Sequence, residues 1–426
     1  MEQGCIRLKP PSSLTAIEGG GVTSARGFKA VGLHAGFRKK SDRLDMALVA
    51  ADEPCAAAAT FTKNVFCSAP VTVSREHLDG ISYGTARAVV INSGNANAAT
   101  GDIGLTHAHE SAQLIADALG CPESEVLVAS TGVIGAHLPM EPFHEHAAEA
   151  VDALSSEGGH DAACAIMTTD TFPKEYAVSY TSKAEGFENM QVTVGGMVKG
   201  SGMIMPDMAT MIAVITTDAP LDAPTAHAAL ISATAVTFNK VTVDSDTSTN
   251  DSCFLLASGK AAQGQGAYIT KGSPAYREFT TALNHVCTTL ARDMASDGEG
   301  ANRLVTVEVV GAKNNDDADT AARAVANSPL VKTAVFGHDA NWGRIAMAIG
   351  KSGAVFRQED VSIDIMGIPV CRGGLTVDFD EDEALKRFEN PEIILWIDLG
   401  AGKGSATMWT CDFSHDYVTI NGDYRT

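Results

Sequence analysis

Short apolar runs rich in valine and isoleucine recur along this 426-residue chain, and they restrict the folds that it can adopt. Such runs are typical of buried strands, and the segments between them carry apolar residues at the 3.6-residue spacing of helices. Because the strands cluster and alternate irregularly with the helices, the pattern favours layered α+β sheets over a regular βαβ winding. The predicted strands end at Asn92 and Ser130 or begin at Met211 and Leu304, and the predicted helices span 106–119, 142–154, 223–235, 275–294 and 317–326.

The length allows two or three domains or subdomains with a sizeable core. Composition indicates a compact globular protein, since 45% of the residues are hydrophobic and 19% are charged. Acidic residues gather after about residue 304, including a run around Asp380. This shift indicates a smaller C-terminal subdomain with a solvated acidic loop, because the run lacks the glycine-centred spacing of a calcium site.

Charge and cysteine content argue against several classes of protein. The formal net charge of −21 repels phosphate backbones and anionic membrane surfaces. No apolar run reaches the roughly 18 residues that cross a bilayer. The nine cysteines are scattered and never spaced CxxC, so they indicate neither a disulfide framework nor a zinc cage. We therefore expect a cytoplasmic protein that binds neither nucleic acid nor membranes.

The stretch from 195 to 219 places glycines around a single lysine, Lys199. Glycines in such number usually form a flexible turn. Lys199, however, lies among apolar residues with no acidic residue nearer than Asp207. That environment is unusual for a cation unless it meets an anionic ligand. The phosphate-binding GxxxxGK[ST] pattern is absent both here and at Gly400 to Ser405.

Three further segments carry polar residues beside predicted strands. At the end of one strand, the Thr131 hydroxyl and the Gly132 N–H could face a single oxygen, as in an oxyanion hole. The segment 91–104 follows another strand and is equally consistent with a ligand loop and a structural turn. The segment 237–252 concentrates hydroxyls and carboxylates, and the pattern alone favours a capped polar loop.

The histidines indicate neither a metal site nor a catalytic triad. The pairs His107/His109 and His144/His146 are each two residues apart on predicted helices, so their side chains face different directions. Without a Ser-His-Asp motif, catalysis needs another base. A new N-terminal amine can serve if the chain is cut, because an α-amino pKa of roughly 7.7–8.0 leaves it substantially neutral. Thr210 is the candidate residue.

Nine motifs follow one another along nearly the whole chain, starting at Gly27. They read GFKAVGLHAGF, NSGNANAATG, ASTGVIG, IMTTDTFPK, GGMVKGSGMIMPDMATM, DSDTSTNDS, DGEGANR, KTAVFGHDANWGR and NGDYRT. In this order they resemble the ornithine acetyltransferase family of arginine biosynthesis, also called bifunctional glutamate N-acetyltransferase and amino-acid acetyltransferase. Each motif alone is ambiguous, but the ordered set is specific.

The resemblance implies a layered α/β sandwich, similar to that of self-cleaving aminopeptidases, in which the chain cuts its own Ala209–Thr210 bond. Residues 1–209 then form an α chain and 210–426 a β chain that contains the C-terminal subdomain. Thr210 becomes an N-terminal nucleophile that takes the acetyl group of N2-acetyl-L-ornithine and passes it to L-glutamate. Thr131 and Gly132 are implied to hold the oxyanion.

The resemblance also implies a set of substrate-binding residues. We expect Lys199 to meet a substrate carboxylate and Glu299 to meet an ammonium group. No metal or organic cofactor is implied, and it stays open whether acetyl-CoA is a second acetyl donor. The expected assembly is a heterotetramer of two α and two β chains. The implied substrate-binding residues are Thr168, Lys199, Thr210, Glu299, Asn421 and Thr426.

Two other functions stay open on the sequence alone. A self-cleaving N-terminal-nucleophile aminopeptidase or amidase would use the same chemistry but give the acyl group to water. Enzymes of that type usually expose a serine, whereas this chain has Thr210. A non-catalytic amino-acid-binding protein would never cut itself, and its glycine-rich loops would only hold the ligand.

Overall fold

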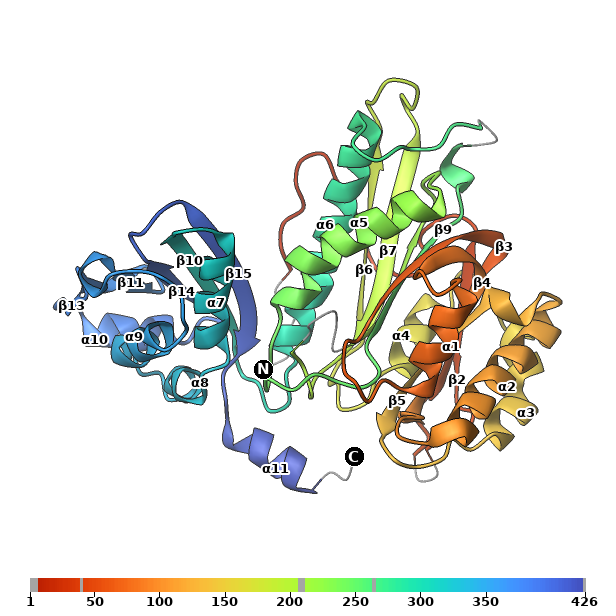
Figure 1. Cartoon of the computed structure of the whole chain (residues 1–426), viewed down its shortest axis with the longest axis horizontal. Coiled ribbons are helices and arrows are strands. Elements are labelled where there is room, and N and C mark those ends of the chain that lie inside the picture. The colour runs from red at the N-terminus through yellow and green to blue at the C-terminus, as the bar shows by residue number, and fades with distance from the viewer. Residues whose placement is uncertain (1–6, 39–40, 206–210, 263–265, 424–426) are drawn as a thin grey trace.

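The computed structural model describes residues 7–38, 41–205, 211–262 and 266–423. In Figure 1 these residues form a large layered unit and a smaller C-terminal unit beside it. Three residues of the predicted site, Ala209, Thr210 and Thr426, lie outside the described residues. The layered α+β class that the sequence predicts, with a smaller C-terminal α/β subdomain, is confirmed.

The large unit is built on one mixed, nine-stranded sheet. Most neighbouring strands are antiparallel, but β8 runs parallel to β9 and β4 runs parallel to β5. The strand order is β1 (Thr15–Ala16), β6 (Lys174–Thr181), β7 (Gln191–Lys199), β8 (Ile212–Thr217), β9 (Ser252–Ala257), β3 (Met46–Phe61), β4 (Tyr83–Asn95) and β5 (Val126–Val133), with β2 (Phe28–Leu33) paired to β3.

Alternate side chains of these strands enter different apolar layers, as the two-residue period of a strand requires. Val89 in β4 and Val214 in β8 belong to the same central core, although they come from different parts of the sheet. Their neighbours point outward: Val90 packs with α2 and α3, and Ile215 packs with α5 and α6. The large unit is therefore an α-β-β-α sandwich.

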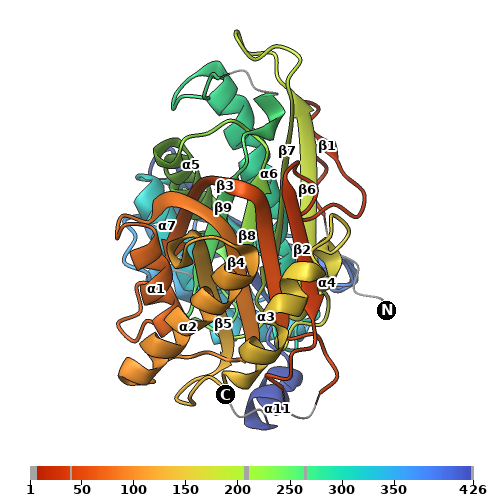
Figure 2. The ribbon, with the colours of Figure 1, turned by 90° about the vertical axis from the view of Figure 1, so that its right-hand side faces the viewer.

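Helices cover both outer faces of this sandwich (Figures 1 and 2). Several have clear starting signals: the Asp222 and Ser273 side chains accept hydrogen bonds from backbone N–H groups in the first turns of α5 and α6, and each helix has proline at its first or second position. The helices are α1 (Ala69–His77), α2 (Gly101–Leu119), α3 (Glu141–Asp152), α4 (Gly159–Ala165), α5 (Ala223–Val236) and α6 (Pro274–Ser296).

The smaller unit has its own sheet and its own apolar core. Its central strands, β10 and β14, are parallel, and β15 closes one edge beside β10. The strand order is β13 (Leu375–Thr376), β12 (Ile368–Arg372), β11 (Ser362–Ile365), β14 (Glu392–Asp398), β10 (Leu304–Ala312) and β15 (Gly404–Cys411). Its helices are α7 (Asn315–Ala326), α8 (Pro329–Phe336), α9 (Trp342–Gly350) and α10 (Glu381–Arg387), and α11 (His415–Asp423) follows β15.

Two expectations about single segments need correction. The acidic run around Asp380 is not only a loop, because Asp380 caps α10. Three acidic residues occupy the first turn of this helix, where their negative charges interact favourably with the helix dipole. Helix α2 begins at Gly101, five residues before the predicted start, although Gly101 and Gly104 are poor helix formers. Among the described residues, no helix is long and apolar enough to cross a membrane.

Candidate active site

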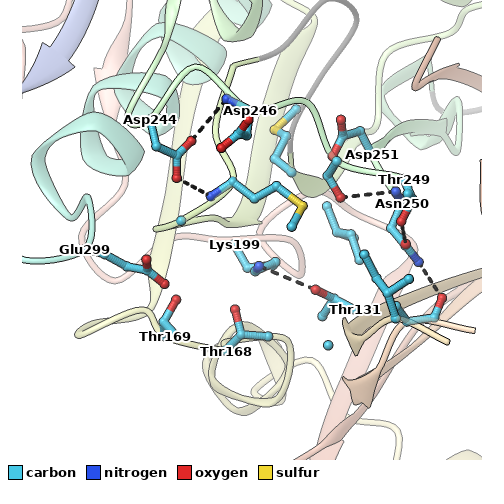
Figure 3. A pocket seen from close by; sticks show the side chains of 18 of the residues that line it. Thr131, Thr168, Thr169, Lys199, Asp244, Asp246, Thr249, Asn250, Asp251 and Glu299 are labelled. Carbon is cyan, nitrogen blue, oxygen red and sulfur yellow. Dashed lines mark hydrogen bonds between the residues drawn. The ribbon is translucent and has the colours of Figure 1, made fainter. Parts of the chain in front are cut away.

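A cavity of about 160 Å³ lies at one edge of the sandwich, where β5 and β7 end and β8 and β9 begin (Figure 3). Loops after α4 and α6 and the helix α11 complete its wall. All the predicted site residues that the structure describes line it, namely Thr131, Gly132, Thr168, Lys199, Glu299 and Asn421. Thr210 has no described position, but its neighbour Met211 also lines the cavity.

The end of β5 carries Thr131 and Gly132 to the cavity wall. Gly132 has a φ of +134°, and a Cβ atom at this position would lie 2.3 Å from the carbonyl carbon of Gly94 in the neighbouring strand. Only glycine permits this close pairing of β4 and β5. The Thr131 side chain is buried at the cavity wall, and its hydroxyl lies 3.5 Å from the Lys199 ammonium.

Lys199 is the last residue of β7 and is only 8% exposed. Burial lowers the pKa of Lys199, because the charged ammonium loses water, while the carboxylate of Asp170 opposes this change. Among the described residues that line the cavity, Lys199 is the single lysine or arginine. The site therefore offers one buried cation to a ligand.

Asp170 holds the loops on either side of Lys199. Its carboxylate accepts hydrogen bonds from the Gly200 N–H at 2.8 Å, the Thr168 N–H at 2.9 Å and the Lys174 ammonium at 2.7 Å. Burial alone would raise the pKa of Asp170, but Lys174, Lys199 and these hydrogen bonds together hold it well below its usual range. Lys174 in turn pairs with Asp297 at 2.5 Å, after α6. These buried charges fix the backbone around the cavity.

Glu299 faces the cavity from the loop after α6 and accepts a hydrogen bond at 2.7 Å from the Asn421 side chain of α11. A Cβ atom on Gly202 would lie 2.4 Å from the Glu299 carboxylate, so glycine is needed for the chain to pass here. The glycines around Lys199 are thus not merely a flexible turn. At least one of them makes room for a carboxylate of the site.

The polar segment before β9 supplies residues that the sequence did not single out. Asp244 accepts hydrogen bonds from the N–H groups of Met203 and Ile204 at 2.6 and 2.8 Å, and burial raises its pKa. The Asn250 amide donates to the carbonyl oxygens of Ala96 and Ser130, which joins this segment to β5. The lining residues without an earlier prediction include Asp244, Asp246, Ser248, Thr249, Asn250, Asp251 and Tyr417. For the residues between 244 and 251, the high density of hydroxyl and carboxylate side chains in the sequence was the signal that could have indicated a site.

The asparagine-rich segment 91–104 is mainly structural. The Asn95 amide donates to the carbonyl oxygens of Ala136 and His137, and Asn97 donates to the carbonyl oxygen of Gly104. Asn97 also adopts a left-handed conformation, with a φ of +46°. Its polar side chains therefore fold the turn, and among the described residues of the segment only Ala96 lines the cavity.

Comparison with known proteins places the chain in a family. Residues 29–426 match the ArgJ family. The chain is 48% identical over 408 residues to the arginine biosynthesis bifunctional protein ArgJ of Symbiobacterium thermophilum, covering 96% of this chain and 99% of the relative. The protein of the same name from Chlorobaculum tepidum is 46% identical, with 94% and 96% covered. The chain therefore belongs to the ArgJ family, and the resemblance seen in its motifs is confirmed.

Among solved structures, one example is similar over slightly less than half of the chain. It is a chain of the ornithine acetyltransferase of Mycobacterium tuberculosis, complexed with ornithine. It shares 40% sequence identity with a TM-score of 0.41, and the match covers 46% of this chain and 100% of that chain.

Proposed function

We propose that this protein transfers the acetyl group of N2-acetyl-L-ornithine to L-glutamate through an acetylated Thr210, giving L-ornithine and N-acetyl-L-glutamate. Membership of the ArgJ family makes the protein an acetyltransferase of arginine biosynthesis. The route through Thr210 and the role of each site residue go beyond family membership and are proposed here. They rest on the residues that meet at the cavity, namely charged side chains, hydroxyl groups and the first residue of β8.

The observation that carries this proposal is the meeting of β7 and β8 at the cavity. Lys199 at the end of β7 pairs with Ile212 at the start of β8, and Met211 and Ile212 line the cavity beside Thr131. Thr210 immediately precedes Met211 in the sequence. A cut after Ala209 would thus create a free amine at the head of a strand that enters the cavity.

The proposed reaction uses that amine as a base. It takes the proton of the Thr210 hydroxyl as Oγ attacks the acetyl carbonyl carbon, and the Thr131 hydroxyl and Gly132 N–H stabilise the resulting oxyanion. The bond from the acetyl carbon to the ornithine nitrogen then breaks, and this nitrogen takes the proton. The neutral α-amine of glutamate attacks the acetyl-threonine ester next. The bond from the acetyl carbon to Oγ breaks as a proton passes from the glutamate nitrogen, through the Thr210 amine, to Oγ, which restores the hydroxyl and releases N-acetylglutamate.

The charges of the cavity suit the carboxylate that the two substrates share and the ammonium group of the ornithine part. Each substrate has a carboxylate that Lys199 can bind, and the ornithine part brings an ammonium group. Four carboxylate residues face the cavity, so an ammonium group finds favourable charge there. We assign the ammonium to Glu299, which Asn421 holds in place. Thr168 and Thr426 complete the proposed set of substrate-binding residues.

The test begins with the mass of the purified protein. We expect two fragments in denaturant and acetyl transfer when acetylornithine and glutamate are added together. The Thr210→Ala variant should be uncut and inactive, whereas Thr210→Ser should still be cut, more slowly. Release of acetate without acetylglutamate would instead support an amidase, and an uncut, inactive wild type would support a binding protein.

Three finer features belong to the same proposal. The relatives are named bifunctional, and we propose acetyl-CoA as a second acetyl donor for glutamate. An assay with acetyl-CoA and glutamate, without acetylornithine, tests this activity. We also propose a cytoplasmic heterotetramer of two α and two β chains, whose mass light scattering can measure, and acetyl transfer that needs neither a metal nor an organic cofactor.

A further inference from the structure

A cluster of two histidines and one glutamate lies away from the cavity, near the start of β5. His77 ends α1, His109 lies in α2, and Glu123 opens the short helix η1 (Glu123–Glu125). Their ligand atoms all lie within 4.8 Å of one another. His77 contacts the first residue of β5, Val126, and Thr131 lies five residues further along, about 16 Å away in an extended strand.

The backbone fixes which nitrogen His77 presents to the cluster. Its Nδ1 atom lies 2.8 Å from the carbonyl oxygen of Val126, which can only accept, so Nδ1 carries a hydrogen and donates it. In a neutral imidazole the other nitrogen, Nε2, then has a lone pair, and it lies 3.4 Å from Oε1 of Glu123. The His77 side chain is only 7% exposed. A lone pair facing a carboxylate is unfavourable in such a place, and either a proton on Nε2 or a metal ion between the two atoms relieves it.

His109 contacts Glu123 from the opposite side, at hydrogen-bonding distance. Its Nδ1 atom lies 2.7 Å from the same oxygen of Glu123, and its Nε2 atom lies 3.4 Å from a carboxylate oxygen of Glu76. Each histidine therefore has one nitrogen in the cluster and an acceptor at the other nitrogen. A carbonyl or carboxylate at the remote nitrogen is the usual surrounding of a histidine that binds a metal ion.

The surroundings of the cluster are acidic. The pocket that contains it is lined by Glu76, Asp79, Glu123 and Glu125, and no lysine or arginine lines it among the described residues. One carboxylate oxygen of Glu125 is buried without a hydrogen-bond partner in the described part of the chain. Both features favour a bound cation.

We propose that His77 Nε2, His109 Nδ1 and Glu123 Oε1 bind one divalent transition-metal ion of the zinc class, with water as the fourth ligand. Ligand atoms about 2.0–2.2 Å from a tetrahedral zinc ion lie about 3.4 Å from each other. The separation of His77 and Glu123 already has this value, and that of His109 and Glu123 opens by about 0.7 Å. Nitrogen ligands favour such an ion over magnesium or calcium, which prefer oxygen.

This site is structural and separate from acetyl transfer. It joins the end of α1, the middle of α2 and η1 to the start of β5, whose other end carries Thr131 and Gly132. No motif predicts this site, because His77, His109 and Glu123 come from three elements and meet only in the fold. The spacing of His107 and His109 argued against a metal site formed by that pair, and the proposed partners of His109 come from other elements instead. The expectation that acetyl transfer needs no metal concerns a different part of the molecule.

The experiment is a titration of the metal-free, full-length protein with zinc ions, followed by calorimetry and by thermal unfolding. We expect one tight site per chain and a rise of several degrees in the melting temperature. His77→Asn keeps a donor for the Val126 carbonyl but removes Nε2, and Glu123→Gln removes the ligand charge with little change in shape. Each should weaken this binding at least 100-fold and abolish the rise in melting temperature.

His144→Asn is the matched control. His144 also pairs with a glutamate, Glu110, at 3.0 Å, but the described residues offer it no third ligand. It should bind zinc as the wild type does. Titration with cobalt should give an absorption spectrum without a thiolate charge-transfer band. The proposal is overturned if the wild type binds no zinc, if both ligand variants bind it as tightly as the wild type, or if cobalt is bound by cysteine thiolates.

Discussion

Lys199 shows how a buried cation can face a cavity. Burial lowers its pKa, yet the carboxylate that opposes this change, Asp170, accepts its hydrogen bonds from Gly200, Thr168 and Lys174. Asp170 thus supplies negative charge nearby without taking up the Lys199 ammonium. Apart from one long hydrogen bond to the Thr131 hydroxyl at 3.5 Å, the Lys199 ammonium is available to a ligand in the cavity.

Replacement of Lys199 by methionine should raise the KM for glutamate by about 30-fold or more, because a buried carboxylate would lose its cation. Steady-state kinetics measure this change, and denaturing mass spectrometry should show that the chain is still cut. Lys183→Met, at an exposed lysine, should leave the KM unchanged and serves as the control. An unchanged KM in Lys199→Met would remove this residue from the site.

The lowered pKa of Lys199 also predicts how substrate binding depends on pH. The charged form binds a carboxylate, so the KM for glutamate should rise as the pH rises through the pKa of Lys199. Because burial lowers that pKa, the rise should begin at a lower pH than for an ordinary lysine. In Lys199→Arg the guanidinium stays charged, and the alkaline rise in KM should disappear.

Single site residues were predictable from the sequence where the signal lay in their immediate neighbours along the chain. Thr131 and Gly132 stand together at a strand end, and Lys199 stands alone among apolar residues. Contacts such as that of Lys174 with Asp297 could not be predicted, because 123 residues separate the partners and only the fold brings them together.

Among the helices, α6 contains an unusual buried acidic residue, Asp293. Both carboxylate oxygens of Asp293 are buried without a hydrogen-bond partner among the described residues. Burial raises the pKa of Asp293 to about 6, although Arg7, Lys174 and Arg292 oppose this change. The folded protein therefore keeps a proton on Asp293 at a pH where the unfolded chain has lost it.

This difference predicts a stability that falls as the pH rises from about 4 through about 6. Raising the pKa from 3.8 to about 6 corresponds to about 3 kcal/mol of lost stability at pH 7. Asp293→Asn should recover part of this loss at pH 7.5 and none at pH 4. Melting temperatures at both values measure the difference, with exposed Asp152→Asn as a control that should show none. Equal effects at both pH values would contradict the assignment.

The secondary structure was predictable where the apolar pattern was strong. The strands around Asn92, Ser130, Met211 and Leu304 are present as β4, β5, β8 and β10, and all five predicted helices are present. The start of α2 was missed because its first turn contains two glycines, and packing in the fold overrides their weak helix propensity. The order of strands within the sheet was not predictable from spacing.

The whole molecule explains how two halves of a cut chain can stay together. Strands β8 and β9, which follow the proposed cut, lie between β7 and β3, which precede it. Each of these two boundaries has six paired residues, from Val194 to Lys199 along β7 and from Ala56 to Phe61 along β3. The buried pair of Lys174 and Asp297 also crosses from one half to the other.

Fragments of 209 and 217 residues (426 − 209 = 217) should therefore elute together from a sizing column in native buffer. They should separate only in denaturant, when both ladders are broken. The uncut Thr210→Ala variant should elute at the same volume as the cut protein. Fragments that part in native buffer would show that the two strand boundaries do not hold them.

Helix α11 follows β15, the last strand of the smaller unit, yet its residues Tyr417 and Asn421 form part of the cavity wall. Every other described wall residue precedes Leu304. During synthesis, a nascent chain can assemble most of the wall early but must wait for more than a hundred further residues before Asn421 reaches Glu299. A chain that ends before α11 would therefore lack the side chain that donates a hydrogen bond to Glu299, even with every earlier part of the wall in place.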